Sequence, residues 1–198
     1  MRRIAHPTFL ALALAVLLPA TSAVAAPYQQ EEAAEEVPVY DESADAATDI
    51  TAALEIAAKE NKRVLIQWGA NWCGWCKLLH GTFQTDRTVS RTLLYEYEVV
   101  YVDIGRWDKN LELAEKFGAD FQSNGVPYLT VLDSEGNVVT HQETGSLEKD
   151  NAHDPELVNS FLTEHQAEYL EAEDLLNDAL AEAGRTHKRV FLTFGAPW

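Results

Sequence analysis

The fold is decided by the stretch Gly69-Ala70-Asn71-Trp72-Cys73-Gly74-Trp75-Cys76-Lys77, which holds both cysteines of this 198-residue chain. A short apolar run at residues 64–68 precedes it and predicts a buried strand. A helix is expected to begin at the cysteine pair and to continue to about residue 83. The start of a helix offers unpaired N–H groups and the positive end of the helix dipole, which lower the pKa of a thiol. A strand, the cysteine pair and a helix in this order predict a redox centre.

Two residues separate Cys73 from Cys76, so the two sulfurs can form and break a disulfide without a long loop. Cys73 is expected to lie exposed at the helix start, where it attacks a disulfide in a partner. Cys76, one turn further and more buried, then resolves the mixed disulfide. The same steps in reverse oxidise or isomerise a partner, so the spacing predicts the reaction and not its direction. A purely structural bridge is the alternative, but closing so short a loop adds little stability.

A Cys-x-x-Cys pair also occurs in metal and haem sites. A structural zinc site needs about four ligands, and His80 alone stands at a ligand-like spacing from Cys73 and Cys76. Attachment of haem requires a histidine directly after the second cysteine, where Lys77 stands. We therefore expect no cofactor and no metal, and keep a partial metal site with His80 as the minor alternative.

The first 25 residues have the parts of a secretory signal peptide. Arg2 and Arg3 form a basic start, residues 9–18 are apolar, and residues 23–25 form an A-x-A cleavage pattern. The apolar run is shorter than the ~20 residues of a membrane-spanning helix. We expect cleavage after Ala25 and export to the periplasm or the medium.

The segment after the signal peptide, residues 26–48, is acidic and low in complexity, which predicts a disordered linker. The whole chain has a formal net charge of −17, which disfavours nucleic acid and anionic membranes as partners.

From residue 49 onward, helical and strand patterns alternate. The last two strand patterns are joined by residues 133–137, a hairpin-type connection. This order predicts an α/β fold with a mixed central sheet and helices on both faces. Helices are expected at 49–58, 74–83, 88–97, 110–117 and 154–167, and strands at 64–68, 99–103, 128–132 and 138–141.

The helix–strand pattern of residues 53–72 returns without a gap as residues 179–198. Lys62-Arg63-Val64 recurs as Lys188-Arg189-Val190, and Trp72 recurs as Trp198. We expect residues 169–198 to be the start of a truncated second repeat, whose parent chain continues with a cysteine. A lone helix and strand cannot bury their apolar faces, so this segment is expected to be loosely held.

The quoted stretch resembles the active-site segment of thioredoxins, and Gly125-Val126-Pro127-Tyr128-Leu129 resembles the segment that holds their cis-proline. The resemblance implies that residues 49–168 form a thioredoxin fold of the exported thiol:disulfide interchange type, followed by the incomplete second thioredoxin-like repeat. It implies a thiol:disulfide oxidoreductase with Cys73 and Cys76 as catalytic residues and a cis Val126–Pro127 bond beside them. The substrate-binding residues that it implies are Trp72, Gly74, Trp75, Val126 and Pro127.

Two positions depart from the thioredoxin pattern. Trp75 replaces the proline before the second cysteine, and Gln67 replaces a buried aspartate that helps to deprotonate that cysteine. An amide cannot accept a proton, so base assistance at Cys76 is expected to be weak. The expected partners are protein or small-molecule disulfides and thiols, with a membrane-linked donor or acceptor of electrons. The alternative function is a thioredoxin-fold module that binds clients or a metal ion with little turnover.

Overall fold

A computed structural model of the chain describes residues 37–193. The predicted signal peptide of residues 1–25 lies outside the described residues, as do the first part of the predicted linker and residues 194–198 of the predicted repeat.

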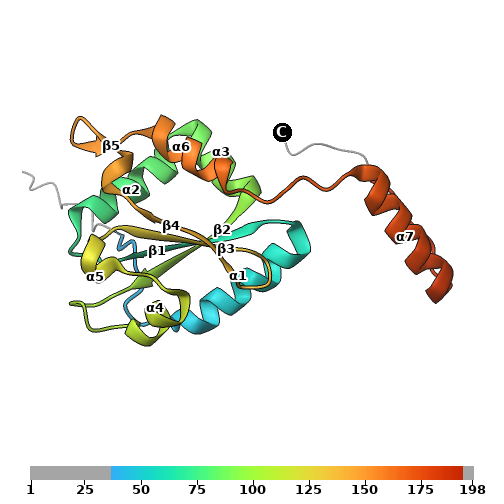
Figure 1. Ribbon diagram of the computed structural model, residues 1–198, viewed down its shortest axis with the longest axis horizontal. Coiled ribbons are helices and arrows are strands. Elements are labelled where there is room, and N and C mark those ends of the chain that lie inside the picture. The colour runs from blue at the N-terminus through green and yellow to red at the C-terminus, as the bar shows by residue number, and fades with distance from the viewer. Residues whose placement is uncertain (1–36, 194–198) are drawn as a thin grey trace, which may run out of the picture. The chain divides into compact units, whose positions relative to one another are not determined.

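The described part of the chain alternates helices and strands (Figure 1). The helices are α1 (Ala46–Glu60), α2 (Gly74–Thr85), α3 (Arg87–Glu96), α4 (Leu111–Phe117), α5 (Phe121–Asn124), α6 (Pro155–Glu164) and α7 (Ala172–Thr186), with a 3-10 turn η1 (Gly145–Leu147). The strands are β1 (Arg63–Gly69), β2 (Tyr97–Asp103), β3 (Tyr128–Leu132), β4 (Val138–Glu143), β5 (Glu148–Lys149) and β6 (Ala152–His153).

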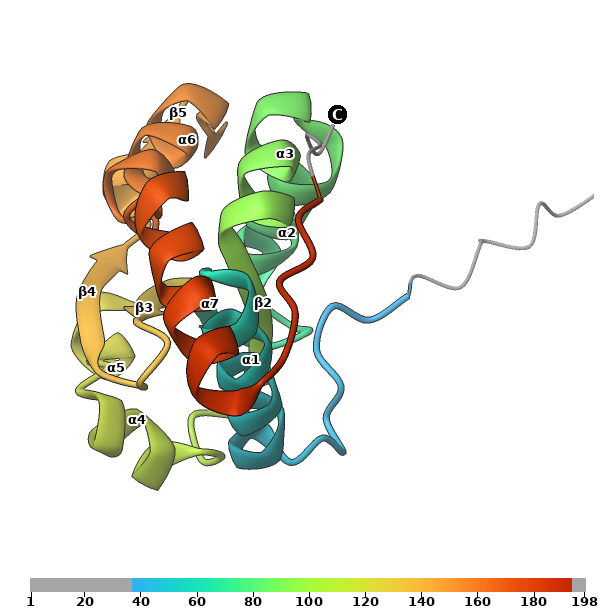
Figure 2. The same cartoon turned by 90° about the vertical axis from the view of Figure 1, so that its right-hand side faces the viewer.

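Strands β1 to β4 form one mixed sheet in the order β2-β1-β3-β4. Strand β1 runs parallel to β2 and antiparallel to β3. Strand β4 pairs antiparallel with β3 and lies at one edge of the sheet (Figure 2). The short strands β5 and β6 form a separate hairpin. The predicted mixed sheet of an α/β fold is therefore confirmed.

The central strand β1 places its side chains alternately in two apolar layers. Val64, Ile66 and Trp68 pack into one layer with residues of α1, α4 and α5. Leu65 packs into the other layer with residues of α2, α3 and α6, which lie over the opposite face of the sheet (Figure 1). Because side chains alternate along a strand, Gln67 belongs to the face that α2 covers. This places its amide beneath the cysteine pair.

The predicted disordered linker, residues 26–48, is wrong over its last part. Helix α1 begins at Ala46, because the carboxylate of Asp45 accepts hydrogen bonds from the N–H groups of Ala47 and Thr48 at 3.1 and 3.2 Å. Before the helix, the side chain of Tyr40 is fully buried. Despite its acidic composition, this segment is ordered because Asp45 caps α1 and the buried Tyr40 anchors the chain before it.

The structure does not confirm the second repeat. Its helix is present as α7, but none of the α7 residues is buried. Residues 188–193 form no strand, and the side chain of Phe191 is 90% exposed. A single strand pattern has no backbone partner unless a neighbouring strand supplies one, which explains why this segment stays irregular.

Candidate active site

The two cysteines form a disulfide at the start of α2, with their Cα atoms 5.3 Å apart. Cys73 is the N-cap of the helix, and its sulfur accepts a hydrogen bond from the N–H of Cys76 at 3.0 Å. The side chain of Cys76 is fully buried, as expected. Cys73 is only 5% exposed, less than expected, because it packs in one cluster with Tyr40 and the partly buried Val126.

The Val126–Pro127 bond is cis and lies beside the disulfide, which confirms the prediction made from the family resemblance. The carbonyl oxygen of Val126 is 3.5 Å from the sulfur of Cys73. Pro127 is buried, and its carbonyl accepts a hydrogen bond from the hydroxyl of Thr144 at 2.8 Å. Thr144, which follows β4, holds the proline segment in place and was missed in the sequence, because a lone threonine carries no signal.

An aromatic rim borders the cysteine pair. The indole N–H of Trp72 donates to the carbonyl of Gly105 at 2.6 Å, while 41% of the Trp72 side chain stays exposed. The ring of Trp107 lies 5.8 Å from that of Trp72, and the Arg106 guanidinium lies 5.8 Å above the Trp72 ring. The turn after β2 thus extends the rim, a feature that the sequence analysis missed.

The two residues between the cysteines differ in exposure. Gly74 is exposed as the first residue of α2. Trp75 is half-buried, and its ring meets that of His153 edge-on at 5.5 Å. His153 is buried, and neither of its ring nitrogens has a hydrogen-bond partner. Trp75 therefore packs on the β5–β6 hairpin and is only partly available at the rim.

Gln67 lies beneath the disulfide and is fully buried. Its side-chain nitrogen donates to the hydroxyl of Tyr40 at 2.6 Å and to the carbonyl of Cys76 at 3.4 Å. Tyr40 was missed in the sequence, although the apolar residues 37–40 stand out within an acidic tract. A buried amide and a buried phenol thus occupy the space below the cysteine pair.

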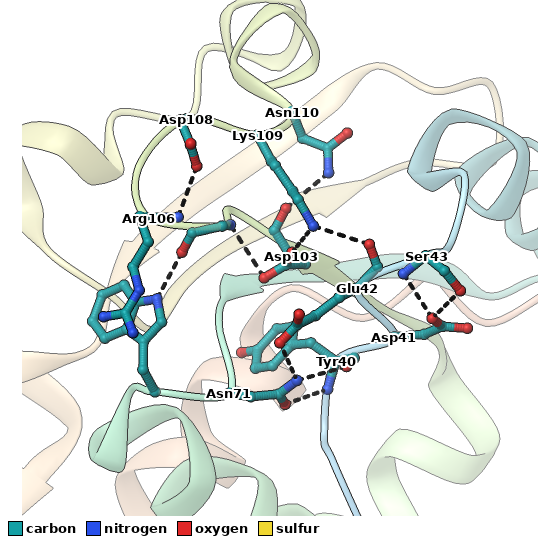
Figure 3. A network of polar contacts seen from close by, with 12 residues as sticks. Tyr40, Asp41, Glu42, Ser43, Asn71, Asp103, Arg106, Asp108, Lys109 and Asn110 are labelled. Carbon is teal, nitrogen blue, oxygen red and sulfur yellow. Dashed lines mark hydrogen bonds and ion pairs between the residues drawn. The ribbon is translucent and has the colours of Figure 1, made fainter.

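Residues 37–44, here named the strap, are fastened across the active-site loop by polar contacts (Figure 3). The amide of Asn71 accepts from the N–H of Tyr40 at 3.0 Å and donates to its carbonyl at 2.9 Å. The ammonium of Lys109 donates to the carbonyl of Glu42 and to the carboxylate of Asp103, both at 3.0 Å. The asparagine next to Trp72 therefore fixes the backbone that carries Tyr40.

His80 does not join the cysteines in a metal site. It is half-buried, its ring lies 5.2 Å from that of Tyr101, and burial lowers the pKa of its imidazole. Within residues 37–193, no group of three or more histidine, cysteine or acidic side chains is placed to hold a metal ion.

A cysteine pair that caps a helix beside a cis-proline, on a mixed sheet of this order, defines a thiol:disulfide oxidoreductase. Residues 45–134 match the sequence model of a family described as thioredoxin-like. A disulphide isomerase from Xylella fastidiosa Temecula1 has a similar structure, with 30% identity, 64% of this chain and 95% of its own covered, and a TM-score of 0.57. The chain belongs to the thioredoxin-like family.

Other solved structures show weaker likeness. The C-terminal domain of Neisseria meningitidis DsbD in the oxidised form is 19% identical, with 50% of this chain and 84% of its own covered and a TM-score of 0.39. A DsbH oxidoreductase is 22% identical over 46% of this chain and 66% of its own, with a TM-score of 0.38. No curated protein sequence matches the chain.

Proposed function

We propose that this protein is an exported thiol:disulfide oxidoreductase that exchanges disulfides with protein or small-molecule partners through Cys73 and Cys76. The observation that carries the proposal is the placement of the Cys73 sulfur at the N-terminus of α2, 3.5 Å from the Val126 carbonyl. The first position stabilises a thiolate. The second lies where an extended substrate segment can pair with the Val126 backbone.

In the proposed reductive direction, the Cys73 thiolate attacks a sulfur of the partner's disulfide, and the partner's other sulfur leaves as a thiolate. Cys76 then loses its proton and attacks the Cys73 sulfur. This step forms the Cys73–Cys76 bond and releases the second partner sulfur with the electron pair. The partner gains two electrons, and a dithiol donor must return two electrons to the protein. Trp72, Gly74, Trp75 and Val126 form the proposed substrate surface, and the buried Pro127 supports it from below.

The two cysteine roles are tested by single variants. Cys76→Ser should accumulate mixed disulfides with partners, because the second step is lost, and Cys73→Ser should not. Equal trapping by both variants would contradict the assignment. Reduction of insulin by dithiothreitol should be faster with the wild-type protein than with the double Cys→Ser variant. Equal rates would favour a client-binding module.

The direction of the reaction is proposed to follow from the reduction potential of the cysteine pair. A titration against glutathione that gives a value near about −270 mV indicates a reductase, and one near about −120 mV indicates an oxidant. A membrane-linked dithiol donor would serve the reductase, and a quinone-linked acceptor would serve the oxidant.

Export is supported by the signal-peptide pattern of residues 1–25. Within residues 37–193, no helix has both the length and the apolar character required to cross a membrane. Fractionation of expressing cells, with N-terminal sequencing of the exported product, tests the proposal. A product that begins at Ala26 would support it, and an uncleaved chain retained in the cytoplasm would refute it.

A further inference from the structure

Tyr40 enters the active site from outside the α/β core. The strap places its ring in one cluster with Cys73 and Cys76, and the ring is fully buried. The surroundings of Gly69 show how close the Tyr40 phenol lies to Cys76. A Cβ atom built on Gly69 would lie 2.7 Å from the Cys76 sulfur and closer still to the Tyr40 hydroxyl. The hydroxyl and the sulfur therefore border the same small space above Gly69.

The hydrogen bonds of Gln67 determine whether the O–H of Tyr40 is left to donate to another group. The carbonyl of Cys76 can only accept, so the Gln67 atom that faces it is the amide nitrogen. The same nitrogen faces the Tyr40 oxygen, which therefore accepts this bond at 2.6 Å. A phenol that accepts from Gln67 keeps its own O–H to donate elsewhere.

The surroundings keep this phenol protonated. Burial raises the pKa of Tyr40 above its ordinary value, so the hydroxyl remains a donor. The ring of Tyr101 meets that of Tyr40 edge-on at 6.0 Å, and the ring of His80 lies 5.2 Å from that of Tyr101. The carboxylate of Asp103, whose charge also raises the pKa of Tyr40, is paired with Lys109 at 3.0 Å.

We propose that the Tyr40 hydroxyl donates a hydrogen bond to the Cys76 sulfur whenever that sulfur carries negative charge. The inference rests on the proposed function and names a residue for the resolving step. When an incoming thiolate attacks Cys73, the Cys73–Cys76 bond breaks and its electron pair leaves on Cys76. The O–H of Tyr40 stabilises this thiolate without giving up its proton. In the reverse step, the same bond favours the ionised form of Cys76 that attacks the mixed disulfide.

Tyr40 acts here differently from a carboxylate base. A base would remove the proton of Cys76, whereas a neutral phenol lowers the free energy of the thiolate that remains. The amide of Gln67 fits this role because it orients the phenol oxygen and takes no proton. In place of a carboxylate base, the chain thus has the amide of Gln67 and the phenol of Tyr40.

The experiment isolates the Cys76 thiol in a Cys73→Ser background. The ultraviolet absorbance of the thiolate is titrated with pH, and the double Cys→Ser protein serves as the blank. Removal of the hydroxyl by Tyr40→Phe should raise the pKa of Cys76 and lower its thiolate fraction at a fixed pH about tenfold, as expected for a hydrogen bond to a charged group. In the protein with both cysteines, reduction of the disulfide by dithiothreitol should slow about threefold or more, because part of the charge has developed on the leaving sulfur.

The matched control is Tyr97→Phe. The Tyr97 side chain is also buried, and its hydroxyl donates to the carbonyl of Leu162 at 2.7 Å, within the other apolar layer. This variant should lose comparable stability and leave the Cys76 titration unchanged. Equal titration shifts in the two variants, or no shift in Tyr40→Phe, would overturn the proposal.

A second variant covers the case that Tyr40→Phe does not fold. Asn71→Ala removes the two hydrogen bonds that fasten the Tyr40 backbone and should also raise the pKa of Cys76, by less. An unchanged titration in this variant would count against Tyr40. The titration needs no partner and no turnover. An inactive wild-type protein would therefore refute the proposed function while the Tyr40 inference is still tested.

Discussion

The substitution Gly69→Ala tests the packing beneath the disulfide. An alanine Cβ would stand 2.7 Å from the Cys76 sulfur and 2.8 Å from the Cζ of Tyr40, with the Tyr40 hydroxyl nearer still. Real Cβ atoms essentially never approach other heavy atoms below 3.0 Å. Cys76 and Tyr40 are both fully buried, so neither can move out of the way into solvent. The added methyl group must therefore displace the phenol or the strand.

The expected cost has two parts. Overpacking of a core by one methyl group costs about 1–3 kcal/mol. Displacement of the Tyr40 hydroxyl also breaks its hydrogen bond with Gln67 and leaves a buried amide N–H without a partner, which costs about 1–3 kcal/mol. We therefore expect Gly69→Ala to lower the free energy of unfolding by about 2–6 kcal/mol, a large part of the 5–15 kcal/mol typical of a domain.

The assay is urea unfolding of the oxidised protein, with Gly81→Ala as the matched control. A Cβ on Gly81, within α2, meets nothing within 4 Å. Alanine is favoured over glycine in a helix, so the control should gain about 0.5–1 kcal/mol. A Gly69→Ala protein as stable as the control would refute the close packing of Tyr40 against Cys76.

Three further predictions concern Gln67, His153 and Asp86. Gln67→Asp introduces a proton acceptor, so it should speed release of a trapped mixed disulfide near neutral pH; an unchanged release rate would exclude a base effect. Burial lowers the pKa of His153 from 6.5 to about 4. The unfolded chain binds this proton more readily, so the contribution of His153 to stability should be complete above about pH 6.5 and fall by about 2–3 kcal/mol toward pH 4. In urea titrations at several pH values, His153→Phe should abolish this fall. Asp86 accepts from the N–H groups of Thr88 and Val89, both at 2.9 Å, as the cap of α3. Asp86→Ala should lower the free energy of unfolding by about 1 kcal/mol, and an unchanged value would show that the cap is dispensable.

The elements that the sequence predicted well are those with local signals. The run at residues 64–68 became β1, and α4 ends at residue 117 as predicted, because Gly118 adopts a positive φ of 68° after it. The helix predicted from residue 154 is α6, which Asp154 caps. Buried runs, caps and glycine stops each act within a few residues, so they can be read from one chain.

The missed features depend on contacts between distant parts of the chain. The short α5 and the β5–β6 hairpin have too few residues for a periodic pattern. Tyr40 and Asn71 are 31 positions apart, and neither residue type predicts the other. The cysteine pair was predicted from its spacing at the start of a helix, whereas the cis-proline was predicted from the family resemblance. The strap was predicted to be disordered because its overall composition hides the effect of Tyr40, the one aromatic side chain that orders it.

The strap has a consequence for how this protein is divided into parts. The family match begins at residue 45, whereas Tyr40 lies before that boundary. A gene fragment that begins at residue 45 and keeps the rest of the chain would encode both cysteines, the cis-proline and the whole sheet, yet it would leave a hole beneath the disulfide. The cysteine pair of such a fragment would differ in its redox properties, although a diagram of family domains would show the fragment as complete. Sequence changes in the strap can thus alter the chemistry of the cysteine sulfurs while the catalytic motif stays the same.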